Sequence, residues 1–482
     1  MTTNLQLGRE QNRWLTLGAL AFALFMIMLD NTIVNVALPA IGDDLGVGLS
    51  ELEWTVNAYA LTFAVLLLLG GELADYLGRR RIFLLGLTVF TLASLACGLS
   101  TSVAMLVGAR AVQGLGAALM LPAALGTIPV LFAPHERGTA IGVWAGASLT
   151  ALTIGPLVGG LVVEHLSWHW IFYVNVPIGV VGLVAALLLV PESHDRSHAQ
   201  RLDGAGLVTS AVGLFALTFA LIEGSAYGWG SPLIVGSFAA AAAGLVGFVI
   251  VERRQRLPML DLSLFADRTF AGANAVALLS ILALFGVFFL FPIYLQSVLE
   301  FSALETGATF LPMTLVLAAT TPLAGRLCDR CGPRLPMTVG MTVVALALAL
   351  AARLDAEAGF WSVAPTLLVA GIGFALTMTP MTAAVLMSAP DDKAGVASAV
   401  VNTFRQIGGA LGVALMGAIV SASLHGAAPA DPRFAAAFVD GFQLALLIGA
   451  AIALAGAATA ALLVGRGEAA RVAAASAARV PA

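Results

Sequence analysis

The sequence predicts an all-α protein that crosses a membrane many times. Hydrophobic residues make up 60% of its 482 residues and charged residues only 10%, whereas soluble domains carry about 25% charged residues. The apolar residues form runs of roughly 17 to 25 residues, the length of a membrane-spanning helix. These runs lack the alternation of apolar and polar residues that marks the strands of a membrane barrel. Helices are then the elements that can satisfy so much backbone in lipid.

Fourteen such runs can be counted along the chain. Their approximate extents are 14–40, 52–73, 82–100, 102–125, 136–163, 169–190, 204–223, 231–251, 270–297, 304–326, 333–352, 359–387, 395–423 and 440–464. Arg9 and Arg13 precede the first run, which is longer than the apolar core of a cleaved signal peptide. We therefore expect this run to be a first span.

The basic residues indicate how these spans are oriented. With the N-terminus inside, 19 of the 23 Lys and Arg residues fall in cytoplasmic tails or turns, which is where membrane proteins concentrate them. Arg353 and Arg433 fall outside, and Arg110 and Arg405 fall within spans. Both termini are predicted to be cytoplasmic. The 19 residues are Arg9, Arg13, Arg79, Arg80, Arg81, Arg137, Arg196, Arg201, Arg253, Arg254, Arg256, Arg268, Arg326, Arg330, Arg334, Lys393, Arg466, Arg471 and Arg479.

An internal repeat divides the chain into two halves. The segment GELADYLGRRR, which starts at Gly71, recurs as GRLCDRCGPR from Gly325, an offset of 325 − 71 = 254. Gly155 in the fifth run is likewise echoed by Gly408 in the thirteenth, with 408 − 155 = 253. We expect residues 1–195 to form a six-helix N-terminal half and residues 265–482 a six-helix C-terminal half with a cytoplasmic tail. Residues 196–264 would form two inserted helices and a linker, and paired halves of this kind are common in secondary transporters.

The two copies of the repeated turn are predicted to act as a cytoplasmic latch. Glycine lets the backbone turn, the aspartate accepts hydrogen bonds, and the arginines hold the turn inside. The alternative is a loop that only sets topology. The latch residues are Gly71, Asp75, Gly78, Arg79 and Arg80 in the first copy and Gly325, Asp329, Gly332 and Arg334 in the second.

Asp30 lies inside the first span, in the stretch LDNTIVNVALP. A carboxylate at this depth costs about 2.5–3.5 kcal/mol on insertion scales, so we expect it to face an interior or a water-filled cavity. Its carboxyl can be protonated when desolvated and ionised when hydrated or paired. Asp30 is therefore the predicted proton-coupling acid, and the alternative is an acid that only packs helices together.

Arg110 lies in the fourth span at nearly the depth of Asp30, and it cannot lose its charge. It needs an internal partner, and Asp30 or Gln113 is the expected one. We predict that Arg110 tunes the coupling acid, whereas the alternative is a fixed structural ion pair. The candidates for a substrate cavity are Asp30, Asn31, Asn35, Gln113, Asn402 and Arg405.

Two later spans carry further candidates. The fifth contains Gly155, Pro156, Gly159 and Gly160, and such residues predict a kinked helix that packs closely against a neighbour. The thirteenth contains Arg405, a second buried cation whose partner would be either an anionic substrate or a protein acid.

Other chemistry is not indicated. Cys97, Cys328 and Cys331 form no disulfide framework, and the CxxC spacing of the last two lacks a second ligand pair. His165 and His169 lack the HExxH spacing of a zinc site. No phosphate-binding GxxxxGK[ST] loop is present, so we expect no ATP, cofactor or metal. The net charge of −4 reflects topology and gives no reason to expect nucleic acid as a partner.

Taken together, the repeated turn, the Asp30 stretch, the Arg110 stretch and the Gly155-Pro156 helix resemble the major facilitator superfamily. With fourteen spans and the sequence LDNTIVNVALP, the chain is similar to the drug:proton antiporters of the EmrB/QacA type. The resemblance covers nearly the whole chain and implies that the Gly-Pro helix marks an exporter that exchanges protons. Tyr76 departs from the family's pattern, which often has a basic residue there, and so do Cys331 and Pro333 in the second turn. The departure at Tyr76 weakens a charge relay through that position.

The predicted function is proton-coupled export of amphipathic, drug-like compounds by alternating access, without enzymatic activity. A metabolite transporter or symporter of the same fold is one alternative, and a membrane-embedded transferase is a remote one. The expected partners are a small-molecule substrate, protons and the lipid bilayer, and the sequence leaves open an accessory periplasmic or outer-membrane protein. Since arginine exceeds lysine by 22 to 1 and alanine is abundant, we expect a bacterial plasma membrane.

Overall fold

The computed structural model describes residues 2–132, 136–193, 204–255, 260, 262–389, 394–424 and 433–465. Within these residues all regular elements are helices, which confirms the all-α prediction. Twelve described stretches are long and apolar enough to cross a membrane. The helices α2 (Leu49–Leu77) and α5 (Arg137–His165) cover two further predicted spans but are not among the twelve. The count of fourteen spans therefore stays a prediction.

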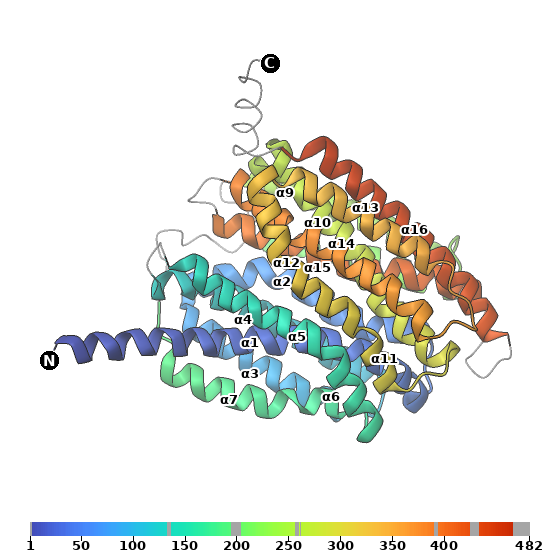
Figure 1. Ribbon diagram of the computed structural model, residues 1–482, viewed down its shortest axis with the longest axis horizontal. Helices are drawn as coiled ribbons and strands as arrows, with labels where there is room; N and C mark the ends of the chain where they lie inside the picture. The colour runs from blue at the N-terminus through green and yellow to red at the C-terminus, as the bar shows by residue number, and fades with distance from the viewer. Residues whose placement is uncertain are drawn as a thin grey trace, which may run out of the picture. The chain divides into compact units, whose positions relative to one another are not determined.

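The chain forms two compact units. Unit 1 consists of Met1–Ala216, Ala240–Met259 and Ser302–Gly307, and unit 2 of Leu217–Ala239, Leu260–Phe301 and Ala308–Ala482. Besides α2 and α5, unit 1 contains α1 (Thr2–Leu45), α3 (Arg79–Gly98), α4 (Val103–Leu131), α6 (Trp170–Tyr173) and α7 (Asn175–Leu189) (Figure 1). Unit 2 contains η2 (Leu262–Ala266), α10 (Arg268–Ile293), η3 (Tyr294–Val298), α12 (Leu311–Cys331), α13 (Arg334–Ala351), α14 (Phe360–Ser388), α15 (Ala394–Leu424) and α16 (Phe434–Leu463).

Three helices are shared between the units. The predicted inserted helices α8 (Gly204–Tyr227) and α9 (Pro232–Arg254) each contribute one part to unit 1 and the other to unit 2. The helix α11 (Ala303–Thr309) lies mostly in unit 1, although it precedes α12 in the chain. The predicted span 304–326 is therefore divided at Phe310, and Pro312 follows in the first turn of α12.

The two units repeat one pattern of helix packing. In unit 1, α2 and α3 pack on α4, α1 packs on α5, and α7 packs on α1 and α3. In unit 2, α12 and α13 pack on α14, α10 packs on α15, and α16 packs on α10 and α13. Each of these six helices of unit 1 thus has a counterpart in unit 2, in chain order. The internal repeat seen in the sequence is also a repeat of tertiary contacts.

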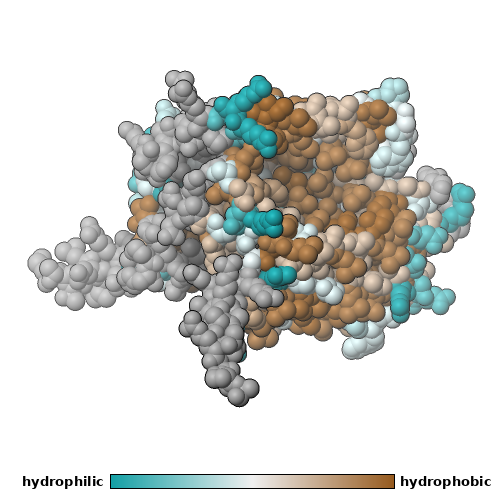
Figure 2. Space-filling view, turned by 90° about the horizontal axis from the view of Figure 1, so that it is seen from above, coloured by the Kyte–Doolittle hydropathy of each residue, from teal (hydrophilic) through white to brown (hydrophobic). Residues whose placement is uncertain are grey.

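Hydrophobic side chains also cover the outside of the molecule. On the face in Figure 2 they form a broad continuous area, and hydrophilic residues gather toward the ends of that area. Large apolar side chains such as Leu188 and Trp361 are mostly exposed. Soluble monomers rarely expose a continuous apolar patch of more than a few hundred Å², so this surface is suited to lipid.

Candidate functional site

The first and fourth helices bring an acid and an arginine together inside unit 1. Asp30 on α1 has no exposed surface and Arg110 on α4 is 1% exposed. Nη1 of Arg110 donates to Oδ2 of Asp30 at 2.5 Å. The predicted pairing of Arg110 with Asp30 is therefore confirmed.

Two amides complete the environment of the Asp30 carboxylate. Nε2 of Gln113 donates to Oδ1 at 2.8 Å, and Nδ2 of Asn175 donates to the same atom at 2.9 Å. With Arg110, three donors surround a carboxylate that water does not reach. A buried ionic pair is stable only when hydrogen bonds also satisfy its remaining lone pairs, and this site meets that condition.

The guanidinium of Arg110 is held as fully as its partner. It donates to Oε1 of Gln113 at 2.7 Å and to the carbonyl oxygen of Thr55 at 3.2 Å. The ring of Tyr59 lies against it, with 4.4 Å from the guanidinium carbon to the ring centroid. An aromatic face favours a cation at this distance. Gln113 bridges the two charged groups, as its position one turn beyond Arg110 predicts.

Several members of this network were not predicted. Gln113 also donates to Oγ of Ser94 at 2.8 Å and lies 3.7 Å from Sγ of Cys97. Asn175 is fully buried at the first residue of α7. The signal for Asn175 was present, because it is a lone amide in the apolar run 169–190. Ser94 and Tyr59 occur in segments whose pattern is that of any span.

The predicted cavity residues Asn31 and Asn35 follow Asp30 on α1. Nδ2 of Asn31 donates to the carbonyl oxygen of Ile27 at 2.9 Å and to the hydroxyl of Tyr59 at 3.4 Å. Nδ2 of Asn35 donates to the carbonyl oxygen of Asn31 at 2.7 Å. Oδ1 of Asn35 is buried and accepts no hydrogen bond from the described residues. These amides extend the polar stretch of α1 by little more than one turn.

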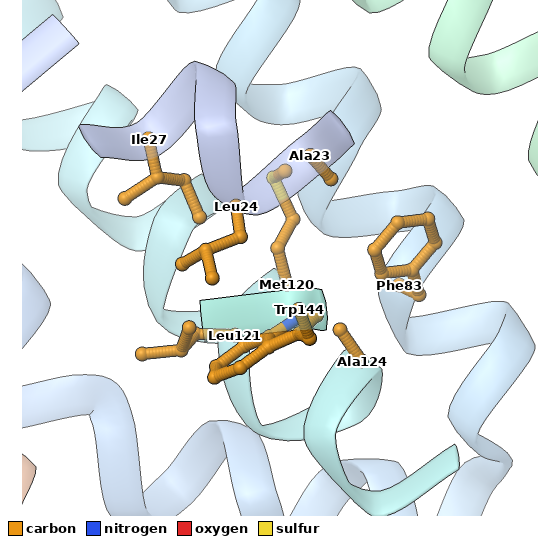
Figure 3. Close-up of a pocket in the computed structure, with 8 residues that line it drawn as sticks. All are labelled: Ala23, Leu24, Ile27, Phe83, Met120, Leu121, Ala124 and Trp144. Carbon is orange, nitrogen blue, oxygen red and sulfur yellow. The ribbon is translucent and has the colours of Figure 1, made fainter. Parts of the chain in front are cut away.

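A small apolar pocket lies one helix turn before Asp30 (Figure 3). Its lining side chains come from α1, α3, α4 and α5, and Ile27 is three residues before Asp30. The only polar side-chain atom in this lining is Nε1 of Trp144, which is buried and has no hydrogen-bond acceptor among the described residues. The lining residues are Ala23, Leu24, Ile27, Phe83, Met120, Leu121, Ala124 and Trp144.

Helix α5 packs closely against two neighbours through its glycines. A Cβ atom at Gly155 would collide with Oγ1 of Thr32 on α1, and one at Gly159 would meet Ile33 at 2.9 Å. A Cβ at Gly160 would collide with the carbonyl oxygen of Ala303 on α11. The predicted close packing of this helix is confirmed, and Pro156 lies within it. Its role in proton exchange remains a prediction.

A carboxylate at the end of α5 holds the start of α11. Oε2 of Glu164 accepts a hydrogen bond from the backbone N–H of Leu304 at 2.9 Å. This bond, together with one from the Ser302 hydroxyl, lowers the pKa of Glu164 from its ordinary value of 4.5, because both stabilise the ionised form. Glu164 lies just beyond the predicted fifth span. The contact therefore persists above pH 4.5 and is lost as the pH falls through the lowered pKa.

We expect Glu164→Gln to loosen α11 while leaving the fold intact. The neutral amide keeps the size of the carboxylate, but a hydrogen bond to a charged acceptor is about twice as strong as one to a neutral acceptor. Hydrogen exchange at the Leu304 amide should become several-fold faster. The control is Glu357→Gln, which neutralises an exposed acid elsewhere. Equal exchange in the parent and Glu164→Gln would rule out a role for this contact in holding α11.

The two predicted latch segments share one backbone feature. Gly78 and Gly332 end α2 and α12 with φ angles of 111° and 74°, a region that other residues rarely adopt. Arg79 donates to the carbonyl oxygen of Gly126 at 2.7 Å, and the N–H of Arg80 donates to Glu192 at 3.2 Å. The first turn is thus tied to the end of α4 and to the segment after α7.

For the other latch residues the structure gives their positions on the helices. Gly71 and Gly325 lie within α2 and α12, Asp329 is exposed, and Arg334 begins α13. The side chain of Asp75 lies outside the described residues. The latch function remains a prediction.

The two remaining cavity candidates, Asn402 and Arg405, lie in unit 2 and are not part of this network. Asn402 and Arg405 are both half-buried on α15. Cys97, Cys328 and Cys331 are free thiols. In the described part of the chain, no group of three His, Cys, Asp or Glu side chains could hold a metal ion.

Comparisons with known proteins agree with this architecture. The profile of the Major Facilitator Superfamily matches residues 20–413. The chain is 34% identical to the tetracenomycin C resistance and export protein of Streptomyces glaucescens, over 91% of this chain and 83% of the relative. It is 39% identical to the puromycin resistance protein of Streptomyces alboniger, over 88% and 86%. The Mycobacterium tuberculosis H37Rv multidrug resistance protein Stp is 38% identical, over 90% and 80%.

Solved structures show the same fold at low sequence identity. A bacterial homologue of the human lysosomal transporter Spinster has a TM-score of 0.67 at 18% identity, covering 94% of this chain and 97% of that one. A POT family peptide transporter has a TM-score of 0.67 at 15% identity, covering 94% and 97%. Three observations point to the same family: the fold has two repeated units, the surface is suited to lipid, and the family profile matches most of the sequence. The chain belongs to the Major Facilitator Superfamily.

Proposed function

We propose that the chain is a proton-coupled secondary exporter of amphipathic, drug-like compounds. Relatives at 34–39% identity are named for resistance to, or export of, antibiotics and drugs, which supports export as the direction of transport. We place the protein in a bacterial plasma membrane with both termini in the cytoplasm, as the distribution of its arginines indicates.

The observation that carries proton coupling is the buried pair of Asp30 and Arg110. A carboxylate inside a membrane protein is costly and marks a functional site by default. In the described structure it is held by three protein donors. A proton arriving at Asp30 removes the charge that balances Arg110. The guanidinium then keeps its existing bonds to Gln113 and the Thr55 carbonyl and needs a new partner for its charge, such as water. Proton binding and helix rearrangement are thereby linked.

The repeated units supply the moving parts of this mechanism. Each is a helix bundle with the same packing pattern, and alternating access in this class moves one such unit against the other. Because Asp30 lies beside the α1–α5 contact at Thr32 and Gly155, a change in its charge acts where α1 meets the close-packed helix. The repeated turns are proposed to bias the two states, and α8 and α9 are proposed to be lateral to the pathway.

The test is proton-driven transport in vesicles that contain only the purified protein. We expect addition of an amphipathic compound to release protons. We also expect a proton gradient that is acidic on the outer side to drive the compound away from the side that corresponds to the cytoplasm. Rhodamine 6G, a permanently charged and fluorescent compound, is the first probe, followed by neutral and anionic ones. Accumulation inside under the same gradient would instead support a symporter.

A further inference from the structure

Arg405 is a cation deep in α15 with no partner in the described part of the chain. It lies eleven residues after Ala394, the first residue of the helix, or about 16 Å along its axis. It is half-buried, and neither a hydrogen bond nor an ion pair to its guanidinium is present among the described residues. Charged side chains at this depth pair with another group or face a water-filled pathway. Arg405 has no such partner among the described residues, and its half-buried guanidinium is suited to face a pathway.

In unit 1 the buried arginine Arg110 has an acidic partner, which Arg405 lacks among the described residues. Arg110 is matched by Asp30, and the network around the two carries no net charge. The repeat locates the counterpart of Asp30 in unit 2, because Gly159 packs on Ile33 as Gly412 packs on Leu282. The equivalent position is 30 + (282 − 33) = 279, which is Leu279. Unit 2 therefore has an apolar residue where unit 1 has its buried acid.

A second unsatisfied polar group lies at the level of Arg405. Gly408 faces Leu278 and Gly412 faces Leu282, so α15 and α10 run in a register of 408 − 278 = 130. This register places Asn274 opposite Phe404, next to Arg405. Asn274 is fully buried, its Nδ2 donates to the Phe270 carbonyl at 2.9 Å, and its Oδ1 accepts nothing from the described residues. Buried amides are almost always satisfied in native proteins.

We propose that Arg405 and Asn274 form a subsite in unit 2 for an anionic group, a carboxylate or similar, on an amphipathic transported compound. This inference rests on the proposed export function and names a substrate class for it. Guanidinium groups bind carboxylates in a bidentate manner, and they gain most where water is excluded. In this proposal the buried Oδ1 of Asn274, which accepts nothing from the described residues, would accept a hydrogen bond from an N–H or O–H group of the compound near that anion.

The balanced network of unit 1 makes it a poor alternative for this role. Every described contact of the Asp30 carboxylate is taken by a protein donor, so a substrate cation would have to displace Arg110. In unit 2 an anion displaces no described partner of Arg405 and neutralises a half-buried charge. In this proposal unit 1 binds the proton and unit 2 recognises the charge of the compound.

The test compares two probes that differ in one group. A dansyl-labelled undecanoic acid and its primary amide are titrated against the purified full-length protein at mildly alkaline pH, and binding is followed by energy transfer from tryptophan. We expect the parent to bind the acid about tenfold more tightly than the amide. Arg405→Gln should remove that preference without weakening the amide. Arg405→Lys should retain part of it, because the charge remains without the planar fork.

Thermal stability provides a second and independent readout. Arg405→Gln removes a half-buried charge that has no partner among the described residues, so its melting temperature should equal or exceed that of the parent. Arg110→Gln should lower the melting temperature, because it leaves Asp30 without its partner. Arg353→Gln, which removes an exposed arginine from the same unit, is the control and should change neither binding nor stability.

Three results would overturn the proposal. They are equal affinity of the parent for acid and amide, equal weakening of both probes by Arg405→Gln, and a loss of stability in that variant as large as in Arg110→Gln. None of these bears on proton release with rhodamine 6G. The subsite and the export function can therefore fail separately.

Discussion

Asp30→Asn should abolish the exchange of protons for transported compound. The asparagine has nearly the shape of the aspartate, but its amide cannot bind and release a proton as a carboxyl group does. Proton release on adding rhodamine 6G to vesicles should disappear, and gradient-driven transport should fall at least tenfold, because an essential proton-transfer group typically contributes that much or more. Asp30→Glu, which keeps a carboxyl group, should still exchange protons.

The same substitution leaves Arg110 without its counter-charge, and this effect has to be separated from coupling. Removing one partner of a buried pair costs about 3–5 kcal/mol. The double variant Asp30→Asn/Arg110→Gln has no unpaired charge, so it should recover much of the stability and none of the coupling. Asp43→Asn, an exposed acid on the same helix, is the matched control. Proton exchange by a stable Asp30→Asn protein would exclude Asp30, and Glu223 on α8 would be the next acid to test.

The buried network was largely predictable because its charges are rare. A membrane span tolerates few ionisable side chains, so Asp30 and Arg110 at similar depths point to each other. Asn175 and Tyr59 complete the site but come from distant segments. Their residue types alone do not predict whether their side chains point toward Asp30 and Arg110. Only the packing of α7 and α2 against the first span brings them to it.

In the fold, too, the sequence pattern predicts the elements, whereas their contacts depend on tertiary packing. Apolar length predicts helices well, and the spacing of Gly78 and Gly332 predicts two matching turns. The break at Phe310 was not predicted, although Pro312 nearby is a signal for one. The glycines of α5 predicted close packing but not its partners, because a small residue shows that a neighbour is near without identifying it.

The partners of those glycines lead to the second large effect. A methyl group at Gly160 meets the backbone carbonyl oxygen of Ala303, which no side-chain change can move. A methyl group at Gly155 meets the Oγ1 atom of Thr32, which a substitution can remove. We therefore expect both Gly160→Ala and Gly155→Ala to impair transport severely, since the helices must separate to admit the new atom.

The two variants should differ in how they are rescued. Thr32→Ala should restore part of the transport to Gly155→Ala, because it removes Oγ1 and leaves only the Cβ atom of residue 32 close by, at 2.9 Å. Thr32→Ser, which keeps Oγ1, should restore none. Ala303→Gly should leave Gly160→Ala impaired, and hydrogen exchange over residues 302–307 should be faster in that variant because α11 is displaced from α5. Gly108→Ala on α4, where an added Cβ meets no atom within 4 Å, is the control and should behave as the parent. If Ala303→Gly rescued Gly160→Ala, the collision would be with a side chain and α11 would be held differently. If both glycine variants transported normally, the close packing of α5 would have no part in the transport cycle.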